Sequence, residues 1–264
     1  MNSKIKKGRV EFNDENYEGA LKYFDEVGED DEDYMYVLIF KITCLMELKR
    51  YGEALFLIES LLSEDPEDEL LLYEKIRCHI ALDEGKEAFD ALKNFEKIIS
   101  PDNKRMLLAV SQFYRLLGDY GNALKFCDKS LEIDDCFEEA IREKSIIGID
   151  LDDDEMINDC ADKLWGIVDN HGIEVVYVFL LKLFTSKFDD CLLIADNLND
   201  DFDEDSIKML KSIVYDEFSK KLGVNVHLNK EAEIPVDDAI SLLKGYDEKG
   251  VCCGMINGIS FRIM

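Results

Sequence analysis

Six short fingerprints recur along this chain of 264 residues at a nearly constant spacing, and this repetition constrains the fold more than any other feature. Their last residues stand at positions 20, 54, 88, 123, 157 and 191, in steps of 34, 34, 35, 34 and 34 residues. Self-similarity at such a period indicates an array of stacked structural units. The fingerprints are 16–20 (Asn-Tyr-Glu-Gly-Ala), 50–54 (Arg-Tyr-Gly-Glu-Ala), 84–88 (Glu-Gly-Lys-Glu-Ala), 119–123 (Asp-Tyr-Gly-Asn-Ala), 153–157 (Asp-Asp-Glu-Met-Ile) and 187–191 (Lys-Phe-Asp-Asp-Cys).

The second unit illustrates how each repeat is built. Apolar residues between 37 and 48 form one helical stripe, and a second apolar stripe runs from 54 to 62. The fingerprint interrupts the two stripes, and Pro66 ends the second one because proline disfavours helix in the residue before it. Each unit is therefore predicted to be a helix, a tight turn and an antiparallel helix. The whole chain has three prolines and is 47% hydrophobic, which favours ordered helix throughout.

The formal charge of −28 limits the classes of partner. Nucleic acids and anionic membranes attract basic surfaces, so we expect neither as a partner. An acidic surface keeps a protein soluble, and a basic partner would also suit this charge.

The eight cysteines show no spacing that is typical of a zinc site. Cys44 and Cys78 occupy the same place in consecutive repeats, roughly 9 Å apart if their helices pack side by side, which is too far for a disulfide. Reduced thiols favour a cytoplasmic location. The N-terminus lacks the apolar core of a signal peptide, and the longest apolar stretch, 175–181, is too short to span a bilayer.

The chain resembles the tetratricopeptide repeat (TPR) family, whose units have 34 residues and a helix-turn-helix fold. The matching positions are a small residue in the first helix (Gly8, Ser111, Ser145), an aromatic at the turn (Tyr17, Tyr51, Tyr120, Phe188), an alanine that opens the second helix (Ala20, Ala54, Ala88, Ala123) and an exit proline (Pro66, with Pro101 displaced by one). The departures are Ile42, Ile76 and Phe179 at the small position, and Ile157 and Cys191 at the alanine position. The resemblance implies an all-α, right-handed α-solenoid.

Three segments are expected. Residues 1–204 hold six TPR-like units, 205–248 form a degenerate helical cap, and 249–264 form a C-terminal hairpin or tail. The cap begins with a helix from Ser206 to Gly223, and residues 237–243 resemble a further second helix. Asn257-Gly258 between apolar runs predicts a β-hairpin.

The resemblance also implies that the first helices line a concave surface. Mapping this sequence onto the family places five arginines and three aromatic residues on or near that face. They are Arg9, Tyr36, Phe40, Tyr73, Arg77, Arg105, Arg115 and Arg142. Arginine and aromatic side chains anchor many interfaces, and arginine pairs with carboxylates, so we expect a partner segment with acidic and apolar side chains. Local salt bridges to the abundant acids are an equally weighted alternative.

Some TPR domains hold chaperone tails with a two-carboxylate clamp, which is absent here. The residues at its five positions are Ile5, Arg9, Phe40, Leu70 and Glu74.

No catalytic motif emerges. The sequence has no glycine-rich phosphate loop and no Gly-x-Ser-x-Gly motif, and its three histidines are scattered. Residues 196–200 begin like a calcium loop, but the glycine and the closing glutamate are missing, which leaves only weak divalent binding to the acidic runs. We therefore expect a non-catalytic scaffold for a protein or peptide, without cofactor or metal. The alternatives are an enzyme or redox-associated subunit with its site at Cys252 and Cys253, and self-association.

Overall fold

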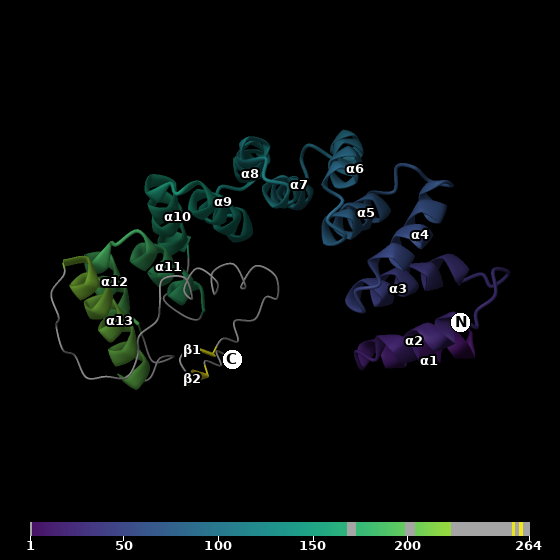
Figure 1. Cartoon of the computed structure of the whole chain (residues 1–264), viewed down its shortest axis with the longest axis horizontal. Helices are drawn as coiled ribbons and strands as arrows, with labels where there is room; N and C mark the ends of the chain where they lie inside the picture. Colours follow the sequence, from purple (N-terminus) through teal and green to yellow (C-terminus); the bar gives the residue numbers. More distant parts are fainter. Residues whose placement is uncertain (1, 168–172, 199–203, 223–254, 257–258, 261–264) are drawn as a thin grey trace. The chain divides into compact units, whose positions relative to one another are not determined.

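The computed structural model describes residues 2–167, 173–198, 204–222, 255–256 and 259–260, and these contain thirteen helices and a pair of short strands (Figure 1). The chain is an all-α solenoid built from helical hairpins. The helices are α1 (Ser3–Asn13), α2 (Tyr17–Phe24), α3 (Tyr34–Glu47), α4 (Tyr51–Leu62), α5 (Glu69–Ala81), α6 (Gly85–Ile98), α7 (Lys104–Leu116), α8 (Tyr120–Ile133), α9 (Glu138–Leu151), α10 (Asp154–Ile167), α11 (Ile173–Phe184), α12 (Phe188–Asp196) and α13 (Glu204–Leu222).

Every fingerprint opens a second helix, as predicted: the even-numbered helices from α2 to α12 all begin within one. The residue just before each fingerprint has a left-handed backbone, with φ between 57° and 77°. These residues are Glu15, Lys49, Asp83, Gly118, Asp152 and Ser186. A left-handed residue ends a helix and reverses the chain, and glycine adopts this conformation with least strain. Five of the six turns therefore have a residue other than glycine in the left-handed conformation, which the sequence alone does not indicate.

The small residues of the repeats lie where helices approach closely. Ala54 and its equivalents at 20, 88 and 123 are fully buried. Gly8 on α1 faces α2 so closely that an added Cβ would lie 2.5 Å from Cε1 of Phe24. Packing of the two helices therefore requires the missing side chain at this position.

In the fifth repeat the small residue lies on the first helix and the large residue lies on the second, the reverse of the second repeat. Ile157 stands at the alanine position and is fully buried, and nine residues earlier on α9 stands Gly148. A Cβ on Gly148 would lie 3.0 Å from Cγ1 of Ile157. The second repeat has a large residue first and a small one second, Leu45 and Ala54. The departure from the family pattern at 157 is thus matched by a compensating glycine.

A ladder of ion pairs joins five of the six second helices to the following first helix. The acid lies five residues after the end of a fingerprint, and the lysine lies on the next helix. The pairs are Lys41–Asp25 (2.6 Å), Lys75–Glu59 (3.0 Å), Lys144–Asp128 (2.6 Å), Lys182–Asp162 (2.6 Å) and Lys211–Asp196. The last pair joins α12 to α13 in the same way.

The ladder is interrupted between α6 and α7. Lys93 stands where the other interfaces have an acid, and Val110 stands where most of them have a lysine. A different cluster joins the two helices, in which the Tyr114 hydroxyl donates to Glu96 and accepts from Lys93. The third and fourth repeats are therefore held together by their own set of contacts.

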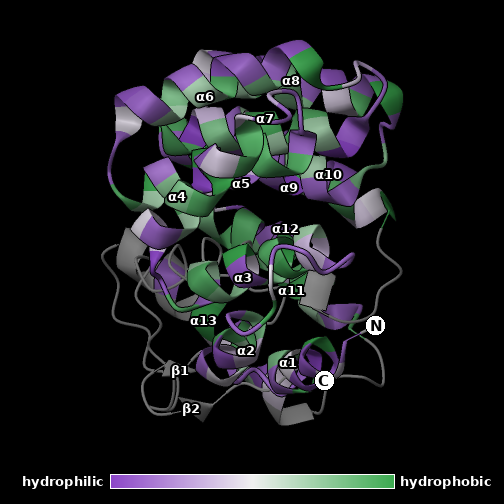
Figure 2. Cartoon of the chain, turned by 90° about the vertical axis from the view of Figure 1, so that its right-hand side faces the viewer, coloured by the Kyte–Doolittle hydropathy of each residue, from purple (hydrophilic) through white to green (hydrophobic). Residues whose placement is uncertain are grey.

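The chain forms two compact units, Met1–Asp119 and Tyr120–Met264. Both are built of amphipathic helices that carry hydrophobic residues beside hydrophilic ones (Figure 2). The core of the first unit includes Phe24, Val37 and Ile58, and that of the second includes Ile157, Val178 and Phe179. In the part of the chain that is described, no helix has the length and apolarity needed to cross a membrane.

At the C-terminal end, α13 lies where a helix was predicted, but it begins at Glu204, so Ser206 lies inside the first turn and does not cap the helix. Strands β1 (Met255–Ile256) and β2 (Ile259–Ser260) pair antiparallel, with Met255 opposite Ser260. The predicted turn at 257–258, the predicted helix at 237–243, and Cys252 and Cys253 lie outside the described residues. The division at 204 and 248 stays a prediction.

Candidate protein-interaction surface

An aromatic cluster joins the first two repeats through their first helices. The Phe40 ring on α3 lies 5.0 Å from the Phe12 ring on α1 and 4.8 Å from the Tyr36 ring, both edge-on. It also stacks on Phe24 at 5.4 Å. The Arg9 guanidinium lies 6.0 Å from the centre of the Phe40 ring, within the range of a cation–π contact. The structure therefore brings together three of the predicted site residues: Arg9, Tyr36 and Phe40.

This aromatic cluster is buried at one end and exposed to solvent at the other. Phe24 is 1% exposed, whereas Tyr36 is 49% exposed. A further apolar side chain on α1, Val10, is also exposed. Rigid rings that are packed against one another lose little conformational entropy when a partner covers them. The sequence reasoning missed Phe12, although its spacing of three residues from Arg9 puts both on one helix face.

A second group lies on α5. The Arg77 guanidinium lies 5.9 Å from the Tyr73 ring, and the Tyr73 ring lies 5.1 Å from the Phe113 ring on α7. Arg77 also donates to both carboxylate oxygens of Glu74, at 3.1 and 2.9 Å. Burial raises the pKa of Glu74, and the charge of Arg77 opposes that rise. Local salt bridging, the alternative considered for the arginines, thus applies to Arg77.

The remaining three arginines are dispersed. Arg105 is exposed in the first turn of α7, and Arg115 is half-buried near the end of the same helix. Arg142 lies in the second unit, where its guanidinium pairs with Glu138 at 3.4 Å. The other seven predicted residues belong to the first unit. A single surface that contains all eight stays a prediction.

The described cysteines are poorly suited to nucleophilic chemistry. Cys44, Cys78, Cys127, Cys160 and Cys191 are buried and free, and burial raises their pKa values to about 11 for Cys44 and Cys78 and about 12 for the other three. Cys136 is exposed, and its hydrogen bond with Asp135 raises its pKa. Thiolates, the reactive form, are therefore disfavoured at these six positions.

Comparison with known proteins identifies similar repeats and similar folds. A family model described as a tetratricopeptide repeat matches residues 12–70. The structure of PilW, described as a widely conserved type IV pilus biogenesis factor, has a TM-score of 0.55 at 12% identity, over 85% of this chain and 96% of that one. A MamA structure, residues 41 to the end from Desulfovibrio magneticus RS-1, has a TM-score of 0.50 at 17% identity, over 63% of this chain and 94% of that one. The likeness to these structures is one of fold. A search of curated protein sequences finds no match.

Proposed function

We propose that this chain, a tetratricopeptide repeat protein, is a non-catalytic scaffold that binds a protein or peptide through the first helices of its N-terminal unit. The observation that carries this proposal is the aromatic cluster of Phe12, Phe24, Tyr36 and Phe40 with Arg9. In the TPR family the first helices line the concave face, so Arg9, Phe12, Tyr36 and Phe40 fall on helices suited to docking.

The chemistry of the cluster favours a partner with apolar side chains. The half-exposed Tyr36 ring offers apolar area, and Arg9 adds a positive charge beside the rings. Aromatic and arginine side chains dominate the binding energy of many interfaces. An acidic group on the partner would be placed against the exposed Arg105, because Glu74 already neutralises Arg77.

A cytoplasmic location accords with the described thiols. Six cysteines are free, and five of them are buried in the repeat cores. A compartment that keeps thiols reduced suits such a chain.

Comparative capture from the native cytosol tests the proposal. The test variant is Arg9→Glu with Tyr36→Ala. The control is Lys7→Glu with Met35→Ala, which makes the same charge change on α1 and removes a neighbouring exposed apolar side chain on α3. Removal of two anchor residues should weaken binding by about tenfold or more.

The expected result is that the wild-type chain and the control recover the same partner while the test variant loses it. Far-ultraviolet circular dichroism confirms that all three chains are folded. Equal recovery by the test variant would refute a role for this cluster.

A further inference from the structure

A second candidate surface lies at Phe56 on α4, beside residues of α2 and α3 in the first unit. Phe56 is 74% exposed, more than any other large hydrophobic side chain in the described part of the chain. The equivalent position, two residues after the fingerprint, holds a charged residue in four other second helices, at 22, 90, 125 and 159. A single exposed apolar side chain is normal on a protein surface, so Phe56 matters only together with the hollow that it borders.

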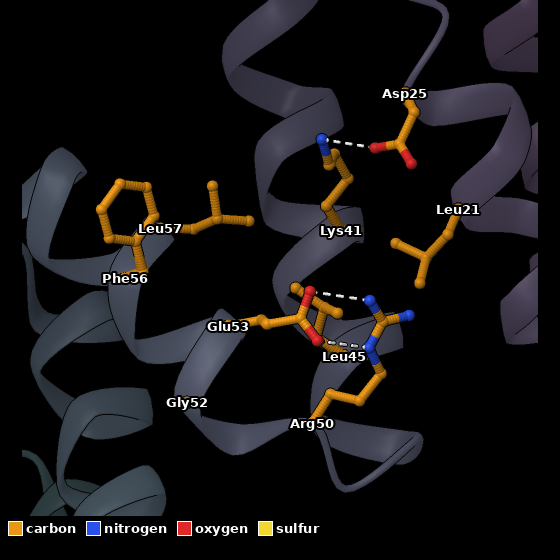
Figure 3. A pocket seen from close by; sticks show the side chains of 9 residues that line it. All are labelled: Leu21, Asp25, Lys41, Leu45, Arg50, Gly52, Glu53, Phe56 and Leu57. Atoms are coloured by element: carbon orange, nitrogen blue, oxygen red, sulfur yellow. Dashed lines mark hydrogen bonds and ion pairs between the residues drawn. The ribbon is translucent and has the colours of Figure 1, made fainter.

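Phe56 borders such a hollow, the α2–α4 groove, which has a volume of about 310 Å³ (Figure 3). Its apolar wall is formed by Leu21 on α2, Leu45 on α3 and Leu57 on α4. The volume is at the lower end of the range for ligand pockets, and is enough to receive one large apolar side chain.

The charges at the rim of the α2–α4 groove are arranged unequally. Lys41 pairs with Asp25 at 2.6 Å, and Arg50 pairs with Glu53 at 2.6 Å (Figure 3). Arg50 also lies 3.7 Å from a carboxylate oxygen of Glu18, which is on α2 beside the groove. The two cations are 19% and 39% exposed, whereas each of the three carboxylates is 60% exposed. The rim is lined by two cations and two carboxylates, and it exposes its carboxylates to solvent more than its cations, around an apolar centre.

We propose that the α2–α4 groove binds a basic segment of a protein partner, with one apolar side chain seated beside Phe56. Lysine or arginine residues flanking that anchor would meet Glu18, Asp25 and Glu53. A second copy of this chain fits poorly, because two chains of charge −28 repel each other. This surface differs from the aromatic cluster in the residues that line it and in the charge of the partner that it favours.

Peptide binding to the full chain tests this inference. The probe is a fluorescein-labelled amphipathic helix of leucine and lysine, and its counterpart replaces every lysine with glutamate. The test variant is Phe56→Ser. The matched control is Leu193→Ser, at the equivalent position of α12, where the leucine is 58% exposed. Neither substitution changes the net charge, so non-specific attraction to the acidic surface is the same in both.

Fluorescence anisotropy should show that the leucine–lysine peptide binds the wild-type chain and the Leu193→Ser variant with affinities within roughly twofold of each other, and the Phe56→Ser variant about tenfold or more weakly. The Arg9→Glu, Tyr36→Ala variant should keep wild-type affinity, which separates this inference from the proposed function. Equal loss in Phe56→Ser and Leu193→Ser, no loss in either, or equal binding of the glutamate peptide would overturn the proposal. Concentration-dependent self-association that Phe56→Ser abolishes would overturn it in favour of a second copy.

Discussion

Replacement of Ile157 by alanine restores the residue that four other repeats carry at this position, and yet it should destabilise the chain. Ile157 is fully buried against Gly148, which has no side chain to fill the space that isoleucine leaves. The loss of three carbon groups removes about 2.4 kcal/mol of burial energy, and the cavity adds to that cost. The better helix propensity of alanine returns about 0.4 kcal/mol. We expect a net loss of about 3 kcal/mol.

Urea unfolding followed by tryptophan fluorescence measures this loss locally. Trp165 is the single tryptophan of the chain, and it lies on the same helix as Ile157, packed against the same core. A local probe is needed because stacked repeats need not unfold as one unit. Cys191→Ala, at the equivalent buried position of the sixth repeat, is the control and should cost about 1 kcal/mol.

A compensating change makes the test sharper. Adding Gly148→Leu to Ile157→Ala recreates the large-then-small order of Leu45 and Ala54, and should recover at least about half of the lost stability. A cost for Ile157→Ala below about 0.5 kcal/mol, or a further loss in the double variant, would refute the reasoning that the two positions compensate in size.

The other predictions concern glycines and thiols. Gly8→Ala should cost about 1–3 kcal/mol in thermal or urea unfolding, because its Cβ would meet the buried Phe24 ring; unchanged stability would contradict the close approach. Gly52→Ala should stabilise the chain by about 0.5 kcal/mol, since the added Cβ meets open space in a helix. Gly118→Ala should destabilise it by about 1 kcal/mol, because Gly118 has a φ of 77° although the space around it is also open. A stability change of the same sign in both variants would count against the left-handed turn. Burial raises the pKa of Cys127 and Cys160 to about 12, so their stabilising effect is complete below about pH 9 and declines as pH rises from about 9 towards 12. Stability of the Cys127→Ala, Cys160→Ala variant should fall less steeply over that range, by up to about 1.4 kcal/mol per pH unit for each thiol, and an equal slope would argue against buried neutral thiols.

The sequence was sufficient to predict the helices because their signals are local and repeated. Apolar spacing and the fingerprints marked where each second helix begins. The left-handed turns at Lys49 and Asp83 were not predicted, because glycine is the residue that usually marks such a turn in a sequence. Among the six turns, only the one at Gly118 has a glycine at this position.

Contacts between repeats were harder to predict than the repeats themselves. The ion-pair ladder depends on which faces of successive helices meet, and a shift of one residue turns a side chain by about 100° around the helix. The grouping of Arg9, Tyr36 and Phe40 was predicted because they share the first-helix face. The pairing of Arg77 with Glu74 was one of two readings that spacing alone did not separate. Phe56 was not singled out, because a phenylalanine within an apolar run shows its exposure only once the helix is placed.

Hydrogen exchange of the chain with its captured partner tests the central claim most directly. Binding through the first helices of the N-terminal unit predicts slower exchange in peptides that cover 3–13 and 34–47, the segments that carry Arg9, Tyr36 and Phe40. Peptides from α10 and α12 should exchange as they do in the free chain. Slowing confined to the second unit, or none in α1 and α3, would contradict the account.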